Sequence, residues 1–112
     1  MSHFTKVGTK INDIAAVERA AARLGWTVRK GKVRGYSGQQ LDADVCLNSG
    51  SDKYDIGLVK TEDGTYAIVA DWWGIETTTG KTEGEVVGEL YRCYALERVL
   101  SACESEGYAY EP

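Results

Sequence analysis

The chain has 112 residues, of which 43% are hydrophobic and 27% charged, and its formal net charge at pH 7 is −4. This length is that of one domain and suffices for a core without disulfides or a structural metal. The composition excludes a disordered tail. The negative charge argues against a generic nucleic-acid binder, because binding to the phosphate backbone needs cationic side chains.

The longest apolar run, residues 66–70, is far too short to span a bilayer, and the first residues lack the apolar centre of a signal peptide. We therefore expect a cytoplasmic protein with no membrane partner. Three cysteines, Cys46, Cys93 and Cys103, are an odd count without Cys-x-x-Cys spacing. Cys93 and Cys103 lie about 15 Å apart along one predicted helix, which is too far for a disulfide. The expectation is three buried, reduced thiols.

The first half of the chain predicts a strand, a helix and two further strands. Residues 3–11 alternate weakly between two faces, as a strand does. Asn12 or Asp13 then caps a helix whose apolar stripe stops before Gly25, a residue type that commonly closes a helix in the left-handed conformation. The second strand is expected at residues 27–36, a turn or loop at 38–42 and the third strand at 43–47.

The clearest local unit is a hairpin of residues 54–59 and 66–73 around the turn Glu62-Asp63-Gly64. Bulky side chains placed opposite bulky side chains fix its register, because a slip of one residue would reverse the faces. The heavy face pairs Leu58 with Ile68, Ile56 with Ala70 and Tyr54 with Trp72. The lighter face pairs Val59 with Ala67, Gly57 with Val69 and Asp55 with Asp71. The heavy face is therefore expected to be the floor of the core.

Residues 74–81 are expected to form a threonine-rich loop. The capping box Thr82-Glu83-Gly84-Glu85 then starts a long helix that runs to about Glu106 and carries a broad apolar stripe. The predicted fold is a single α+β domain over residues 1–112. It has two layers, a mostly antiparallel sheet of four to five strands and two helices on one face.

Four blocks of the sequence are distinctive: Met1-Ser2-His3-Phe4-Thr5, Leu24-Gly25-Trp26, Tyr54-Asp55-Ile56-Gly57-Leu58 and Val69-Ala70-Asp71-Trp72-Trp73-Gly74. Together they resemble a small family first described as the hypothetical chloroplast reading frame "thirty-five", whose function is unknown. Its members occur in algal plastids, cyanobacteria and other bacteria. The resemblance covers nearly the whole chain and implies a compact protein of the cytoplasm or the plastid stroma. It implies no activity and assigns no functional residue.

The Asp55–Asp71 pair is the first candidate site. Like charges directly opposite on a sheet are destabilising, so two carboxylates there require a cation, a shared proton or a basic partner. The basic side chains that could supply this partner, or hold a phosphate, lie on a neighbouring strand: Arg29, Lys30, Lys32 and Arg34. Alternatively, the aspartates sit at a wet hairpin end where screening removes the cost, and the basic strand is an edge protected by its charge.

Trp72 and Trp73 form the second candidate. Adjacent strand residues point to opposite faces, so helices on one face leave one tryptophan near the surface, where it can anchor a partner. The alternative is that the loop with Thr77 and Thr78, or the C-terminal segment, covers it. His3 is the only histidine and cannot build a zinc site alone, so we expect neither a metal nor a cofactor.

These observations favour a non-enzymatic protein-interaction module, an adaptor or an inhibitor of a larger assembly. It would use the open sheet face and residues 74–81, and a homodimer through that face is a version of the same hypothesis. One alternative is a small enzyme or ligand-binding protein, with a divalent cation at Asp55 and Asp71 and a phosphorylated ligand against the basic strand. A third hypothesis, an acidic mimic that blocks a nucleic-acid-binding protein, suits a net charge of −4 poorly.

Overall fold

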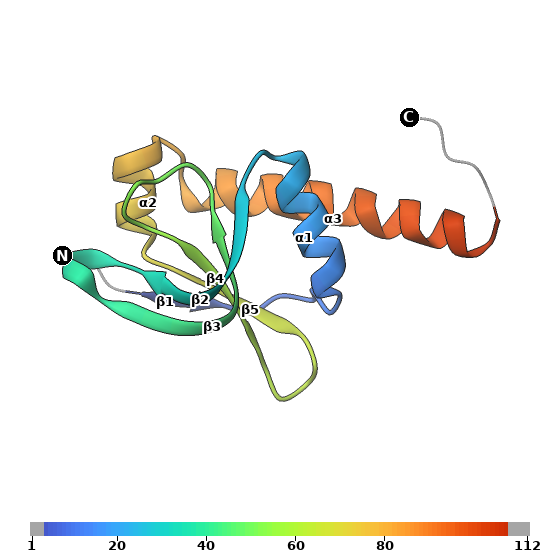
Figure 1. Cartoon of the computed structure of the whole chain (residues 1–112), viewed down its shortest axis with the longest axis horizontal. Helices are drawn as coiled ribbons and strands as arrows, with labels where there is room; N and C mark the ends of the chain where they lie inside the picture. The colour runs from blue at the N-terminus through green and yellow to red at the C-terminus, as the bar shows by residue number, and fades with distance from the viewer. Residues whose placement is uncertain (1–3, 108–112) are drawn as a thin grey trace.

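The computed structural model describes residues 4–107, which form an antiparallel sheet and three α-helices (Figure 1). The strands are β1 (Thr5–Val7), β2 (Thr27–Arg34), β3 (Gln40–Asn48), β4 (Ile56–Lys60) and β5 (Tyr66–Ala70). The helices are α1 (Ile14–Arg23), α2 (Trp72–Thr79) and α3 (Glu83–Ser105), and a short 3-10 turn, η1 (Tyr36–Gly38), joins β2 to β3. The strand order is β1-β5-β4-β3-β2. The predicted α+β fold is confirmed, with a third helix in addition.

Capping chemistry sets the ends of the two longer helices as the sequence predicts. The side chain of Asp13 accepts a hydrogen bond from the backbone of Ala16 at the start of α1, and Gly25 follows the helix with a φ of 76°. Thr82 and Glu85 form the complete capping box at the start of α3. In Figure 1, α1 crosses α3, and the C-terminal half of α3 projects beyond the sheet.

The main core lies between these helices and the heavy face of the β4–β5 hairpin. The ladder pairs Leu58 with Ile68 and Ile56 with Ala70, which confirms the predicted register. Helix side chains pack on this floor, and the buried ones include Val17, Ile75, Leu90 and Tyr94. Their alignment follows from the period-2 pattern of the strands, since a one-residue slip would expose the heavy face.

The hairpin is shorter than the sequence predicts, because β5 ends at Ala70 and α2 begins at Trp72. Asp71 causes the change: its carboxylate accepts a hydrogen bond from the backbone N–H of Gly74 at 3.2 Å and caps α2. The expected strand pairs of Tyr54 with Trp72 and of Asp55 with Asp71 are therefore not in the ladder. The expected loop at residues 74–81 is mostly helix.

Two further boundaries differ from those expected, and one strand is bent. The predicted first strand, residues 3–11, is confined to Thr5–Val7 among its described residues. The loop expected at residues 38–42 is shorter, because β3 already begins at Gln40. A bulge between Arg29 and Gly31 bends β2, and Gly31 has a φ of 131° that suits glycine.

The face of the sheet away from the helices is also covered, because the β2–β3 hairpin curls over it. Val33 of β2 is fully buried, and a Cβ at Gly57 of β4 would lie 2.5 Å from its Cγ2 atom. Phe4 precedes β1 at one edge of the sheet and Gly35 follows β2 at the other, yet their contact is so close that a Cβ at Gly35 would lie 2.5 Å from Cζ of Phe4. No open sheet face therefore remains around Gly57 and its neighbours.

Candidate functional site

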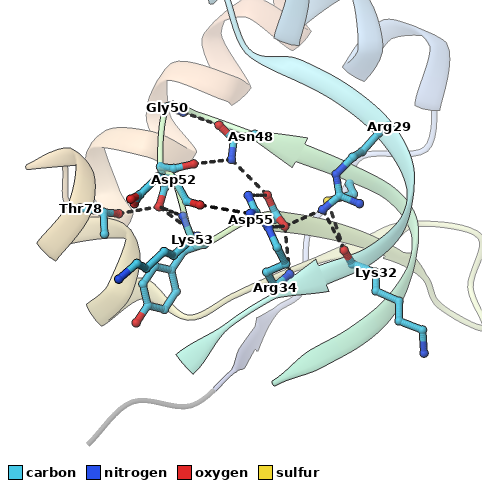
Figure 2. Close-up of polar contacts among 12 residues, drawn as sticks. Arg29, Lys32, Arg34, Asn48, Gly50, Asp52, Lys53, Asp55 and Thr78 are labelled. Atoms are coloured by element: carbon cyan, nitrogen blue, oxygen red, sulfur yellow. Dashed lines mark hydrogen bonds and ion pairs between the residues drawn. The ribbon is translucent and has the colours of Figure 1, made fainter. Parts of the chain in front are cut away.

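Asp55 lies at the centre of a hydrogen-bonded cluster at the start of β4 (Figure 2). Its carboxylate is fully buried and accepts hydrogen bonds from Arg29 Nη2 at 2.7 Å and from Asn48 Nδ2 at 3.1 Å. Arg34 donates three more, from its backbone nitrogen at 3.0 Å, Nε at 2.8 Å and Nη2 at 3.1 Å. The basic partner expected from the strand thus exists, and it consists of the two arginines.

These donors keep Asp55 ionised. Burial alone raises the pKa of a carboxyl group, but the hydrogen bonds from the Arg34 and Asn48 side chains and the Arg34 backbone lower the pKa of Asp55 from 3.8 to about 2. The hydrogen bond with Asp55 in turn raises the pKa of Arg34. Burial, together with the nearby Asp55 carboxylate, raises the pKa of the Cys46 thiol to about 11. The Asp55 carboxylate is thus fully hydrogen-bonded and paired with Arg29 and Arg34. The Cys46 thiol beside it stays protonated at neutral pH and is therefore unreactive.

The two lysines of the basic strand do not join this cluster. Lys32 pairs with Asp42 at 3.3 Å on the exposed surface, while its backbone oxygen accepts a hydrogen bond from Arg29. Lys30 is exposed on the same strand. An exposed pair of this kind contributes little to stability. The four basic residues therefore divide between a buried ion pair and a solvated strand edge.

Asp71, Trp72 and the threonines of α2 all have structural contacts. Asp71 is 1% exposed and caps the helix, and the side chain of Trp72 is partly buried against the core. Thr77 donates a hydrogen bond from its hydroxyl to the backbone oxygen of Trp73. Thr78 Oγ1 lies 2.6 Å from the hydroxyl of Ser51, which ties α2 to the loop before β4. Asp55 and Asp71 are thus held by different partners and lie inside the protein.

Of the two predicted tryptophans, Trp73 is the one that reaches the surface, with 54% of its area exposed. Its ring meets that of Tyr36, which is 43% exposed, at a centroid distance of 6.3 Å and an interplanar angle of 81°. Such an edge-to-face contact is a favoured aromatic geometry. We refer to Tyr36 and Trp73 as the aromatic surface.

A groove of about 500 Å³ adjoins Tyr36. It is lined by residues of η1 and its flanks and by the segment before β4: Arg34, Gly35, Tyr36, Ser37, Gly38, Gln39, Gln40, Asp52, Lys53 and Tyr54. Ser37 has a φ of 55°, a left-handed conformation that costs a non-glycine residue about 1 kcal/mol. Strained residues of this kind concentrate at functional sites.

The sequence assigned no site role to Tyr36, Lys53 or Tyr54. The available signal was local: Gly35-Tyr36-Ser37-Gly38 places an aromatic residue between glycines in a turn, where its side chain has few neighbours to pack on. The contact between Tyr36 and Trp73 joins residues far apart in the sequence, so periodicity could not reveal it.

Residues 20–112 match the family described as "Protein of unknown function (DUF1257)". The chain belongs to the DUF1257 family. The matched region contains β2 to α3 and therefore includes both the Asp55 cluster and the aromatic surface. No curated protein and no solved structure is significantly similar to the chain.

Two further features concern possible ligands and membranes. Residues 4–107 contain no group of three or more histidine, cysteine or acidic residues placed to hold a metal ion. Within the same residues, no helix combines the length and the apolar character needed to cross a bilayer. His3, the single histidine, lies outside the described residues.

Proposed function

We propose that this member of the DUF1257 family is a non-enzymatic protein-interaction module that binds its partner through the aromatic surface. The observation that carries the proposal is the exposure of two large rings, Tyr36 and Trp73, which pack on each other and leave about half of each in solvent. Exposed tyrosine and tryptophan side chains are the residue types that most often anchor protein interfaces. Their mutual contact fixes both rings before a partner arrives, which lowers the entropic cost of binding.

The burial of Asp55 and Asp71 moves the proposed partner surface away from the two aspartates. Asp55 accepts five hydrogen bonds, so its oxygens have little capacity left for a substrate or a cation. This saturation favours the interaction hypothesis over a ligand-binding site at the two carboxylates. A thermal shift with millimolar Mg²⁺, Mn²⁺ or Ca²⁺ that disappears in Asp71→Asn would favour the ligand-binding alternative instead.

The proposal also covers the branch of the DUF1257 family to which the chain belongs. We infer that the chain lies within the branch that resembles the chloroplast reading frame "thirty-five", and that it works in the cytoplasm or the plastid stroma. Two blocks that carry this resemblance, residues 54–58 and 69–74, meet where the Tyr54 ring packs on Gly74, next to Trp73. The resemblance thus includes the part of the fold that supports the aromatic surface.

The test is affinity capture from a native lysate with the wild-type chain, Trp73→Ala and Val99→Ala. Val99 is 50% exposed on α3 and serves as the matched control for loss of exposed apolar area. We expect the wild type and Val99→Ala to capture the same partner and Trp73→Ala to lose it. Capture of that partner by Trp73→Ala at full yield would refute the assignment. Light scattering on the purified chain identifies the case in which the partner is a second copy.

A further inference from the structure

The C-terminal half of α3 carries a second apolar stripe, which faces away from the rest of the protein. Burial ends at Glu97, the last buried residue of α3, although the helix continues to Ser105 and projects beyond the sheet (Figure 1). Glu97 faces α1, where it pairs with Arg19 and Arg23. Val99 lies about 200° around the helix axis from Glu97 and is 50% exposed. The stripe around Val99 is therefore on the side of α3 opposite to α1.

This stripe repeats with a period of seven residues, as the contact face of paired helices does. It has an apolar centre and one charged residue at each end, and none of its members is buried. We call it the α3 seam. Its centre consists of Ala95, Leu96, Val99, Ala102 and Cys103, and its ends are Arg92 and Glu106. A helix surface that remains in water is normally polar, so an apolar seam beyond the core indicates a contact with another helix.

The two charges at the ends of the α3 seam have no partner among residues 4–107. The side chains of Arg92 and Glu106 make neither a hydrogen bond nor an ion pair within this part of the chain. Glu106 also lies at the C-terminal end of α3, whose last turn holds no basic residue. A carboxylate is unfavourable there, because the helix dipole is negative at that end. A cation from another molecule would stabilise both Glu106 and the end of the helix.

We propose that the α3 seam binds the same seam of a second copy of the chain, with the two helices antiparallel and Val99 at the twofold axis. Arg92 precedes Val99 by seven residues and Glu106 follows it by seven. The twofold axis therefore places Arg92 of each copy beside Glu106 of the other. A parallel pairing would set Arg92 against Arg92 and Glu106 against Glu106, so the charges select the antiparallel one.

The sizes of the apolar side chains fit the same arrangement. Leu96 falls opposite Ala102 of the second copy, and Cys103 falls opposite Ala95, so each larger side chain meets a small one. The seam is about 21 Å long, which makes a small interface, and we expect a dissociation constant in the micromolar range. The inference goes beyond the proposed function, because α2 with the aromatic surface lies at the other end of the molecule (Figure 1).

Sedimentation equilibrium of the full chain at low salt, over a range of concentrations, tests the inference. We expect the mass to rise with concentration towards twice the 12.3 kDa of one chain. Val99→Glu places two carboxylates at the twofold axis and should weaken the dimer at least about thirtyfold. Its circular dichroism should match that of the wild type, since Val99 is exposed. Trp73→Ala should leave the dissociation constant unchanged.

Charge reversal tests the antiparallel pairing itself. Arg92→Glu and Glu106→Arg each make both end pairs repulsive and should weaken the dimer about tenfold. An equal mixture of these two variants should dimerise as tightly as the wild type, because one chain then carries two carboxylates at the seam ends and the other two guanidinium groups. Glu104→Arg is the matched control, since Glu104 is on the α1 side of the same helix end, and should have no effect.

A chain that stays monomeric up to about 0.5 mM would overturn the inference. So would a dimer that survives Val99→Glu, or a mixture of the two charge-reversal variants that fails to associate. A dimer lost in Trp73→Ala but kept in Val99→Glu would place the second copy on the aromatic surface instead. The lysate capture tests the proposed function separately, because Trp73 lies outside the α3 seam.

Discussion

Arg34 and Asp55 are joined through both their side chains and their backbones. The backbone N–H of Arg34 donates to the Asp55 carboxylate, and the backbone N–H of Asp55 donates to the Arg34 oxygen at 3.1 Å. β2 and β4 are separated by β3 in the sheet, yet this contact ties the end of one to the start of the other. The curl of the β2–β3 hairpin, and with it the position of Tyr36, therefore depends on one buried carboxylate.

Removing either partner should destabilise the fold. We expect Asp55→Asn to lower the free energy of unfolding by about 3 kcal/mol, as for other buried pairs that lose one member. Arg34→Met should cost at least as much, because it removes two of the five hydrogen bonds and one of the two positive charges that hold the buried carboxylate. Lys32→Ala breaks only the exposed pair with Asp42 and should change stability by less than about 0.5 kcal/mol. Urea unfolding followed by tryptophan fluorescence measures all three, and equal effects would contradict the assignment.

The same carboxylate predicts how stability depends on pH. The pKa of Asp55 is about 2 in the folded chain and 3.8 as the ordinary value. Its contribution is therefore complete above pH 4 and is lost as the pH falls from about 4 to 2, a change of about 2 kcal/mol. Denaturant titrations at several pH values should show this loss in the wild type and a flatter profile in Asp55→Asn. An unchanged slope in that variant would place the acid sensitivity elsewhere.

Two glycines in helices should respond in opposite directions to alanine. At Gly74 of α2 a Cβ would lie 2.0 Å from the Tyr54 ring, so Gly74→Ala should lower the free energy of unfolding by about 3 kcal/mol. At Gly88 of α3 no atom lies within 4 Å of the added Cβ. Gly88→Ala should raise stability by about 0.5–1 kcal/mol, the usual gain in helix propensity. Thermal unfolding of both variants checks the two signs.

Cys46 should be protected from thiol reagents in the native protein. It is fully buried, and burial together with Asp55 raises the pKa of its thiol to about 11, so at neutral pH little thiolate forms. Cys93 and Cys103 are partly exposed, contrary to the expectation that all three thiols are buried, and should react first. Labelling with a chromogenic disulfide should give two fast thiols and a third that appears only with urea. Three equally fast thiols would contradict the packing of β2 over β3 and β4.

Much of the fold was predictable because its signals are local. The register of Ile56 and Leu58 against β5 follows from alternation, and the caps at Asp13 and Thr82 follow from short hydrogen-bonding patterns. The start of α2 was not predicted, since Asp71-Trp72-Trp73 continues an apolar strand and the threonines after it favour strands. Burial of Ile75 and the contact of Gly74 with Tyr54 outweigh these propensities.

The candidate site was predictable in part for the same reason. The basic strand suggested a partner for Asp55, and the structure identifies that partner as Arg29 and Arg34. The exposure of Trp73 was expected from two adjacent tryptophans, although a helix and not a strand presents it. The contact between Trp73 and Tyr36 was not expected, because it requires the β2–β3 hairpin to curl over the sheet.

The position of β1 has a consequence for the order of folding. The hairpins β2–β3 and β4–β5 join neighbouring segments, whereas Thr5 pairs with Ala70 across 65 positions of sequence and Phe4 packs on Gly35. Closing so large a loop costs chain entropy before any contact compensates for it. β1 should therefore dock after the other strands have formed, and its backbone amides should exchange with deuterium through local detachment while β4 and β5 remain protected.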